Sequence, residues 1–291
     1  MAGWRTVVVT DIASLSVKND VLVVKDDVDF TYPIGQIREL VIDSYRGDIS
    51  LPLIHTLAAN DINVVFCDAK HNPDCFLEGL NLHTESAGCI MDQAAWTRQR
   101  KDVVWASVVR KKLRMQRELL NMLQLDGVEE LVTCEADVEV GDSTNREGLG
   151  ARIYFKSLFG PDFIRHDEDG SGINSALNYG YSILLSMVNR ILVSHGYNTA
   201  LGIHHCSRVN SSNLSCDIME PFRPLVDRVV FRNAGRVLDW DYKRELISIM
   251  QAECMYAGKH MRIDTAIEAM TLDLMAAMVD VETRIGVVSF G

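Results

Sequence analysis

The sequence has little of what defines several large classes of protein. Proline accounts for 6 of its 291 residues and apolar residues for 47%, a composition that excludes a collagen-like chain and argues against a disordered one. No apolar run approaches the roughly 18 to 20 residues of a membrane span, and the first residues lack the basic and apolar segments of a signal peptide. We therefore expect a globular, cytoplasmic protein that does not act at a membrane.

The sequence also lacks any Cys-x-x-Cys pair. Its cysteines are odd in number and widely separated: Cys67, Cys75, Cys89, Cys134, Cys206, Cys216 and Cys254. Disulfide frameworks and closed zinc sites use paired spacings that are missing here. The pattern is typical of reduced thiols, most of them buried as small apolar groups.

An excess of basic residues is absent as well, because the net charge is −11. Taken alone, this argues against nucleic-acid binding, since Lys and Arg make the phosphate contacts. Residues 98–117 are an exception: they hold eight basic residues and one acid, a net +7, so the other residues together carry −18. This segment is either the solvated face of a helix or a phosphate-binding ridge.

The spacing of the basic residues favours one stripe on a helix. Arg110, Arg114 and Arg117 stand at i, i+4 and i+7, so they would share a face. The apolar residues that could face the core are Trp96, Val103, Val104 and Val108. We predict that the arginine stripe is free to contact DNA.

Two kinds of hydrophobic periodicity divide the chain. Short β-branched runs separated by turns predict strands at 4–10, 13–20, 21–27, 37–43 and 62–68, with a short helix at 51–60. Helical spacing then predicts helices at roughly 91–125, 143–159, 171–195, 215–232, 239–256 and 260–278. We predict an α+β protein, with a small β-rich amino-terminal domain (residues 1–80) and a large α-helical domain (residues 81–291).

Several residues are suited to end or begin these helices. Asp142 or Ser143 could cap the helix predicted at 143–159, and Gly160 would stop it. Ser171 could cap the next helix, and Gly196 follows its last periodic residue.

Metal-capable side chains gather between residues 201 and 224. They are His204, His205, Cys206, Cys216, Asp217 and Glu220. A zinc site could use His204, Cys206 and Cys216, but their spacing matches no common finger or ribbon. One imidazole with carboxylates would instead suit Mg²⁺ or Mn²⁺.

Carboxylates near helix starts could complete such a site. Asp217 and Glu220 stand at i and i+3 on one face of a predicted helix, and Glu147 opens another helix beside Gly148 and Gly150. The helix dipole also favours acids in a first turn. The residues by themselves leave both explanations open and do not place Glu147 next to the later cluster.

Three motifs resemble a known family. EGLGARIYF (147–155), SALNYGYSILLSMVNRILVSHGYNTALGIHH (175–205) and LSCDIMEPFRPLVD (214–227) are similar, in order and spacing over about eighty residues, to CRISPR-associated protein one. That family is the integrase of the spacer-acquisition machinery. WRTVVVT and FCDAKHNP near the amino terminus resemble the subfamily found in type II loci.

The resemblance implies a fold and a set of site residues. The fold would be a β-rich amino-terminal domain, a helical catalytic domain and a homodimer. The family's catalytic metal ligands, a Glu, a His and an acid, fall on Glu147, His205 and Glu220. Asp217 would have an auxiliary or structural role and is a further candidate ligand.

The doubled histidine departs from the family pattern. The spacing Gly202-x-x-His205 favours the second histidine without excluding His204. Adjacent residues in an extended loop point to opposite sides, so we do not expect both to reach one ion. Cys206 and Cys216 have no ligand role in the family, and we expect them to pack.

The resemblance also implies an activity. The family inserts a captured DNA fragment (the prespacer) into the CRISPR array at a repeat, by attack of a 3′-hydroxyl on a phosphodiester with Mg²⁺ or Mn²⁺. Its partner is a small ferredoxin-like CRISPR-associated protein two, with the effector nuclease and a ring-forming accessory protein in type II loci. The alternatives are a stand-alone metal-dependent nuclease and a non-catalytic DNA-binding assembly subunit.

Overall fold

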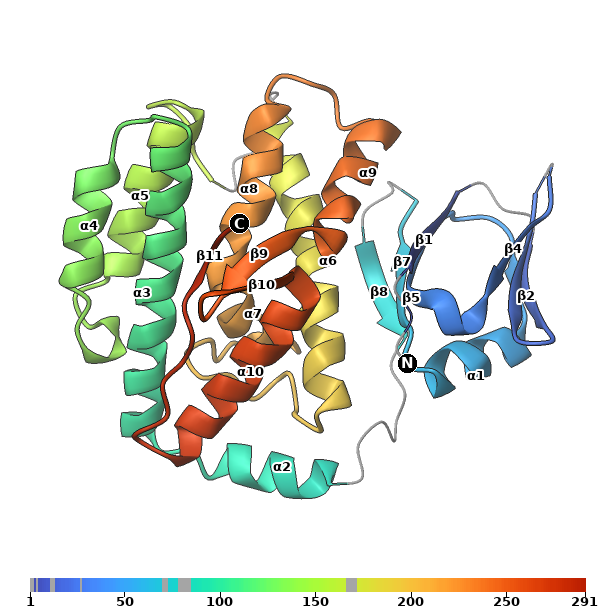
Figure 1. Ribbon diagram of the computed structural model, residues 1–291, viewed down its shortest axis with the longest axis horizontal. Helices are drawn as coiled ribbons and strands as arrows, with labels where there is room; N and C mark the ends of the chain where they lie inside the picture. Colours follow the sequence, from blue (N-terminus) through green and yellow to red (C-terminus); the bar gives the residue numbers. More distant parts are fainter. Residues whose placement is uncertain are drawn as a thin grey trace. The chain divides into compact units, whose positions relative to one another are not determined.

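Strands precede helices along the chain, as the predicted α+β class requires (Figure 1). The computed structural model describes residues 3, 5–10, 14–26, 28–69, 73–77, 85–165 and 172–291. One compact unit comprises Met1–Ser86 with Val193–Gly196, and the other comprises Ala87–Leu192 with Tyr197–Gly291. The predicted boundary between residues 80 and 81 lies outside the described residues.

The first unit contains two four-stranded sheets. One has the order β1 (Arg5–Thr10), β5 (Ile37–Asp43), β7 (Asn63–Cys67) and β8 (Pro73–Leu77), with the first three parallel and β8 antiparallel. The other has the order β4 (Phe30–Pro33), β3 (Val21–Lys25), β2 (Ser14–Lys18) and β6 (Asp48–Ile49). All five predicted strand regions are confirmed; β4, β6 and β8 were not predicted.

A single helix joins the two sheets into one core. Helix α1 (Leu51–Ala59) begins where the Ser50 side chain accepts a hydrogen bond from the backbone N–H of Leu53 at 3.4 Å. Leu53 and Leu57 are fully buried in the same cluster as residues of both sheets. The predicted helix at 51–60 is therefore confirmed, and its apolar face explains why two small sheets form one stable core.

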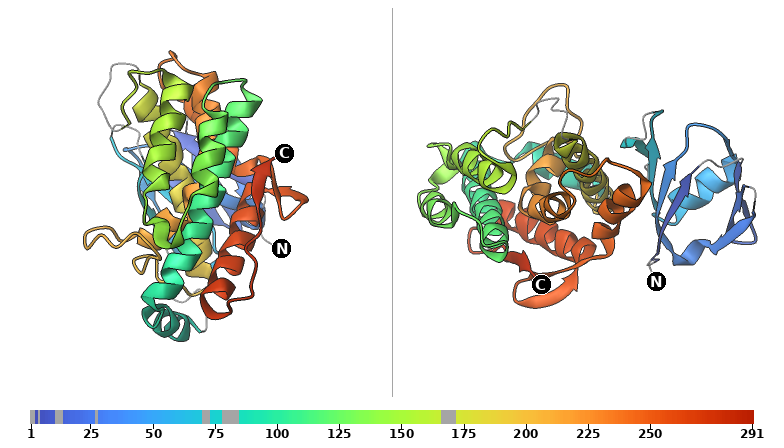
Figure 2. Two further views of the ribbon diagram at one scale, coloured as in Figure 1. Left: turned by 90° about the vertical axis from the view of Figure 1, so that its left-hand side faces the viewer. Right: turned by 90° about the horizontal axis from the view of Figure 1, so that it is seen from above.

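The second unit is built around the long helix α3 (Arg98–Met122). The other helices are α2 (Ser86–Ala94), α4 (Val128–Ala136), α5 (Arg146–Phe159), α6 (Ile173–Ser194), α7 (Asn213–Met219), α8 (Arg223–Arg232), α9 (Trp240–Ser248) and α10 (Ile263–Val279). Helix α3 packs against α4, α5, α8 and α10, and Figure 2 shows α4 and α5 beside it. No helix in the described part of the chain is long and apolar enough to cross a membrane.

Helix α3 differs in two ways from the prediction. The helix predicted at 91–125 is interrupted, because the Thr97 side chain accepts from the N–H of Arg100 at 3.2 Å and starts a new helix. Val104 and Val108 are buried as expected, but Val103 is 43% exposed and Trp105 fills the core in its place.

The prediction of a domain that is nearly all helix was wrong near the carboxyl end. A three-stranded sheet forms there, with the order β10 (Lys259–Arg262), β9 (Glu253–Tyr256) and β11 (Val288–Phe290). Ala257 and Gly258 both have positive φ, 49° and 77°. Such a pair makes the two-residue turn that suits a hairpin, so the helix predicted at 239–256 ends early and that at 260–278 starts late.

Candidate active site

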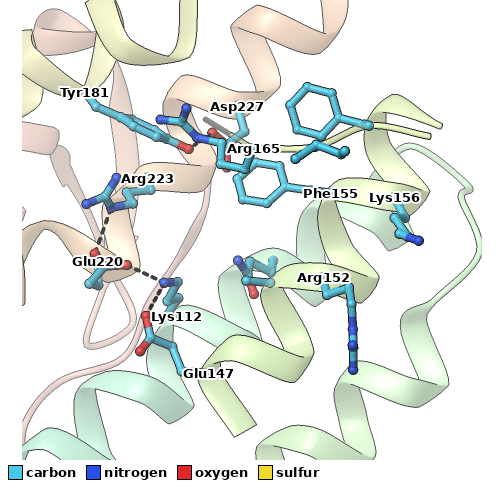
Figure 3. Close-up of a pocket in the computed structure, with 14 residues that line it drawn as sticks. Lys112, Glu147, Arg152, Phe155, Lys156, Arg165, Tyr181, Glu220, Arg223 and Asp227 are labelled. Carbon is cyan, nitrogen blue, oxygen red and sulfur yellow. Dashed lines mark hydrogen bonds and ion pairs between the residues drawn. The ribbon is translucent and has the colours of Figure 1, made fainter. Parts of the chain in front are cut away.

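The site is centred on a lysine that lies between two carboxylates (Figure 3). Lys112 Nζ of α3 is 2.6 Å from Glu147 Oε1 of α5 and 2.5 Å from Glu220 Oε2, which follows α7. The side chains of Lys112 and Glu220 are 10% and 4% exposed, and that of Glu147 is 25% exposed. The fold thus brings two of the predicted ligands to one cation.

Local hydrogen bonds hold Glu147 in the first turn of α5. The cap residue is Asn145, whose Oδ1 accepts from the N–H of Gly148 at 3.1 Å. Asp142, one of the two predicted caps, accepts from the N–H groups of Arg146 and Glu147 at 2.8 and 2.9 Å. Ser143 instead donates to Glu139. The predicted cap Ser171 lies outside the described residues, and Gly160 ends α5 as predicted.

Opposite charges keep Glu220 ionised. Arg223 Nε lies 2.9 Å from Glu220 Oε1, on the side away from Lys112. Burial alone would raise the pKa of Glu220, but the charges of Arg223 and Lys112 outweigh it and lower the pKa to about 2. Burial would likewise lower the pKa of Lys112, yet Glu220 and Glu147 raise it. Lys112 and Glu220 are therefore both charged at neutral pH.

Asp217 shapes the loop that carries the histidines. This fully buried carboxylate accepts from the backbone N–H groups of Ile203, His204 and His205 at 2.6, 3.1 and 3.0 Å. A Cβ at Gly202 would lie 2.2 Å from the carbonyl oxygen of His205, so the tight loop requires glycine there. These contacts explain a structural role for Asp217, and its role as a metal ligand stays a prediction.

The two imidazoles have different surroundings. The ring of His204 stacks on Trp105, with centroids 4.2 Å apart and planes 6° apart. His205 Nδ1 lies 2.7 Å from Asp217 Oδ1. The hydrogen bond with Asp217 raises the pKa of His205 against the effect of burial, and the charges of Asp217, Glu220 and Glu147 add to the increase. The ring of His205 also lies edge-on to Trp105, with centroids 5.9 Å apart, and the two imidazole centroids are 5.8 Å apart. The prediction that the two side chains point to opposite sides is therefore not confirmed, and the choice of His205 over His204 as a ligand stays a prediction.

The donors suit a hard divalent ion, although the side chains are not closed around one. Among the described residues, no three His, Cys, Asp or Glu side chains come close enough together to hold a metal ion as they stand. Two carboxylates and an imidazole are the donors that Mg²⁺ and Mn²⁺ accept, and the ammonium of Lys112 shows that a cation fits between the carboxylates. The ligand set Glu147, His205 and Glu220 stays a prediction.

The expectation for the cysteines is confirmed for their redox state and wrong for their burial. All seven are reduced thiols outside disulfides, as predicted, but the buried ones are Cys67, Cys134 and Cys254, fewer than half. Cys206 is exposed, so its predicted packing role is wrong, and Cys216 is partly buried.

A cavity of about 540 Å³ opens beside the carboxylates. Its lining residues include Lys112, Glu147, Arg152, Phe155, Lys156, Arg165, Tyr181, Glu220, Arg223 and Asp227 (Figure 3). The sequence assigned no role to Lys112, Arg165, Tyr181, Arg223 or Asp227. Three of them lie within the motifs that resemble the known family: Tyr181, Arg223 and Asp227. Their place in these motifs was the sequence signal that could have marked them as site residues.

Asp227 is the acceptor of a buried tyrosine pair in this cavity. Tyr154 donates to its Oδ2 at 2.8 Å and Tyr181 donates to its Oδ1 at 2.5 Å. The guanidinium groups of Arg223 and Arg165 lie over the Tyr181 ring, 4.5 and 5.4 Å from its centroid. Burial raises the pKa of Asp227 to about 6, although the tyrosine hydrogen bonds and nearby arginines oppose the increase.

Asp227→Asn should change how stability depends on pH. The pKa of Asp227 rises from an ordinary 3.8 to about 6 on folding, so the folded protein binds the extra proton between these values. The resulting stabilisation is full below about pH 4 and is lost as pH rises through about 6. An amide does not titrate. Between pH 4 and 7 the free energy of unfolding of the unmodified protein should therefore fall by up to about 3 kcal/mol relative to that of the variant. Urea unfolding at several pH values measures the difference. A stability difference that is constant over this range would contradict the shift.

The predicted arginine stripe is not free. Arg114 and Arg117 lie 2.8 and 3.6 Å from the Glu135 carboxylate of α4, and Arg110 donates to the carbonyl oxygen of Val138. Each of the three arginines has a partner within the chain, because α4 and the residues after it pack against α3, although Arg110 is exposed at the surface. Their contact with DNA stays a prediction.

Other cations are better placed. Arg152 and Lys156 are exposed side chains on α5 at the mouth of the cavity. Within the described part of the chain, neither forms an ion pair or a side-chain hydrogen bond. They are therefore available to phosphate groups in a way that Arg114 and Arg117 are not.

Comparisons with known proteins show what the chain is similar to. The family model for CRISPR associated protein Cas1 matches residues 6–250. The CRISPR-associated endonuclease Cas1 of Neisseria meningitidis serogroup C (strain 8013) is 29% identical over 286 residues, which is 95% of this chain and 93% of the relative.

Solved structures share the fold. A casposase bound to an integration product superposes with a TM-score of 0.74 at 19% identity, over 97% of this chain and 92% of the casposase. A chain of the Cas6-RT-Cas1–Cas2 complex gives a TM-score of 0.71 at 20% identity. The match covers 94% of this chain, which spans about a third (35%) of that longer chain.

Proposed function

The chain belongs to the Cas1 family of CRISPR-associated proteins, and from this premise we propose that it is a metal-dependent DNA integrase and endonuclease. One observation carries the proposal: Glu147 and Glu220, from separate helical segments, share one cation at a cation-lined cavity. The charges of both acids also act on the imidazole of His205. Two acids held this close together cost free energy unless a cation offsets their charge, which favours a site that holds a cation.

Glu147, His205 and Glu220 would hold Mg²⁺ or Mn²⁺. When bound, the ion would supply Lewis-acid activation of the attacking hydroxyl and stabilisation of charge on the phosphoryl oxygens. Asp217 contributes by engaging Nδ1 of His205, which leaves Nε2 as the nitrogen with a free lone pair. Arg223 contributes by keeping Glu220 ionised.

The proposed reaction is an exchange of phosphodiester bonds. The 3′-hydroxyl of a captured fragment attacks a phosphodiester at the edge of a CRISPR repeat; one P–O bond forms as another breaks, and a 3′-hydroxyl leaves. No protein nucleophile is needed, so the chain's own task is to position and neutralise phosphates. With water in place of the hydroxyl, the same site would act as an endonuclease.

The proposed partners follow from the family. They are prespacer and repeat DNA, a second copy of the chain, and the small ferredoxin-like protein two, with the effector nuclease and ring-forming accessory protein if the locus is type II. The shared fold with a casposase bound to an integration product and with a Cas1–Cas2 complex supports the DNA and protein-two partners.

An integration assay tests the proposal. A labelled fragment with a 3′-hydroxyl is incubated with supercoiled repeat DNA, Mn²⁺ and protein two, next to a fragment with a blocked 3′ end. We expect labelled plasmid from the free 3′-hydroxyl and none from the blocked end. A stand-alone nuclease would cut without joining the fragment, and a non-catalytic subunit would do neither; either result would overturn integrase activity.

Replacing both Arg152 and Lys156 by Gln should weaken binding to duplex DNA of any sequence. Each phosphate contact that is lost should reduce the slope of log K against log salt by about 0.9. Arg244→Gln is the matched control, because this α9 side chain is 66% exposed and pairs with Asp241 away from the cavity. An unchanged slope in the double variant would remove these residues from the DNA surface. The same titration on Arg110, Arg114 and Arg117 tests the sequence-based stripe.

A further inference from the structure

Lys112 is placed unlike the other cations of the cavity. Its ammonium lies within 2.6 Å of both candidate ligand carboxylates, whereas Arg223 pairs with only one of these two acids, Glu220. The neighbouring lysine on α3, Lys111, is buried to the same degree but donates to Ser107 Oγ at 2.9 Å. The contact of Lys112 with both acids is therefore specific to its position and is not a general consequence of burying lysine on this helix.

The ammonium and a divalent ion cannot occupy this position together. Mg²⁺ binds carboxylate oxygens at roughly 2.1 Å. Such an ion would approach Glu147 Oε1 and Glu220 Oε2, and Lys112 Nζ already contacts both of these oxygens. Two cations held between the same pair of acids would also repel each other strongly in a buried site. Binding of the ion therefore requires Lys112 to withdraw.

The cavity provides space for the withdrawn side chain of Lys112. Lys112 lines the 540 Å³ space directly, so its flexible stem needs no opening of the core to reach it. Five cations and three acids line that space, with Lys112, Glu147 and Glu220 among them. An ion that satisfies Glu147 and Glu220 would leave the remaining wall strongly positive, which favours an incoming phosphate group.

We propose that Lys112 is an internal counter-cation that holds the two carboxylates together, is displaced by the divalent ion, and then contacts substrate phosphate. Metal binding and DNA binding at this site thereby strengthen each other. The inference rests on the proposed function, because it takes Glu147 and Glu220 as metal ligands. It assigns Lys112 a positioning role that a purely structural ion pair would not have.

The test measures Mn²⁺ affinity of the full chain without DNA, by calorimetry or by electron paramagnetic resonance. Lys112→Met removes the competing charge and keeps the length of the side chain, so we expect Mn²⁺ to bind at least about tenfold more tightly. Lys111→Met is the matched control and should leave the affinity unchanged. Equal or weaker Mn²⁺ binding in Lys112→Met would overturn the inference.

Adding a phosphate-bearing oligonucleotide tests the coupling. In the unmodified protein it should tighten Mn²⁺ binding severalfold, and in Lys112→Met it should change that affinity much less. Glu147→Gln separates this inference from the proposed function: undiminished Mn²⁺ binding in that variant would refute the ligand set itself. Weakened binding there, with no gain in Lys112→Met, would refute the role of Lys112 alone.

A second measurement needs no substitution at Lys112 and covers the case in which the Met variant fails to fold. Amine-reactive labelling of the unmodified protein, read by mass spectrometry, should modify Lys112 slowly without Mn²⁺ and at least about tenfold faster with saturating Mn²⁺. Lys259, an exposed residue of β10, is the reference and should react equally in both conditions. Protection of Lys112 that does not change with Mn²⁺ would contradict its displacement.

Discussion

Glu147→Gln should reduce strand joining by about two to three orders of magnitude while the protein remains folded. The substitution removes one charge from the proposed ion site, and loss of a group that stabilises developing charge typically has an effect of this size. The side chain is a quarter exposed, and Lys112 retains Glu220 as a partner, so the fold loses little. The integration assay measures the effect, with unfolding by urea as the check on stability.

Glu129→Gln provides the control for this result. Glu129 is also an acid in the first turn of a helix, α4, but it is exposed and outside the cavity. If both acids served only to interact favourably with a helix dipole, the two variants would have the same strand-joining activity. Full joining activity in Glu147→Gln would show that Glu147 is a helix-start acid and no ligand.

Asp217→Asn should cost about 3 to 5 kcal/mol of the free energy of unfolding, the range for breaking a buried charged network. The carboxylate is fully buried and accepts from three backbone N–H groups and His205. An amide presents one oxygen and one NH₂ group, so the NH₂ group of the variant would face backbone N–H groups that now donate to a carboxylate oxygen. Urea unfolding measures the loss, and Glu147→Gln should show far less of it.

Asp241→Asn is the matched control for Asp217. Its carboxylate is 67% exposed and pairs with Arg244 on the surface, so we expect a change of about 1 kcal/mol or less. A similarly small change in Asp217→Asn would mean that the histidine loop is held by other contacts, and the structural account of Asp217 would fail.

Patterns of local origin were predictable from the sequence. The strands of the first unit and helix α1 follow from β-branched runs and apolar spacing, because one face of each is buried. The hairpin of β9 and β10 escaped prediction, since its strands are four residues long and Ala257 is an unusual residue for a turn with positive φ. Cys254 and Tyr256 do alternate as buried residues, but two positions are too few to establish a period of two.

The site was harder to predict because its residues interact over long distances along the chain. The acids Glu147 and Glu220 could be named from their motifs, whereas Lys112 belonged to a basic run with no mark to separate it from Lys111. Only the packing of α3 against α5 and the segment after α7 assigns one lysine to the carboxylates and the other to Ser107. The pairing of Arg114 with Glu135 depends in the same way on where α4 lies.

The origin of the cluster from α3, α5 and the segment after α7 has a consequence during synthesis. Lys112 leaves the ribosome long before Glu220, so a partly made chain holds one carboxylate and its ammonium without the second acid. Contacts between such distant residues form late, once the loop between them has closed. In a nascent or truncated chain the proposed ion site therefore lacks one of its two carboxylates, and it stays incomplete until translation has passed Glu220.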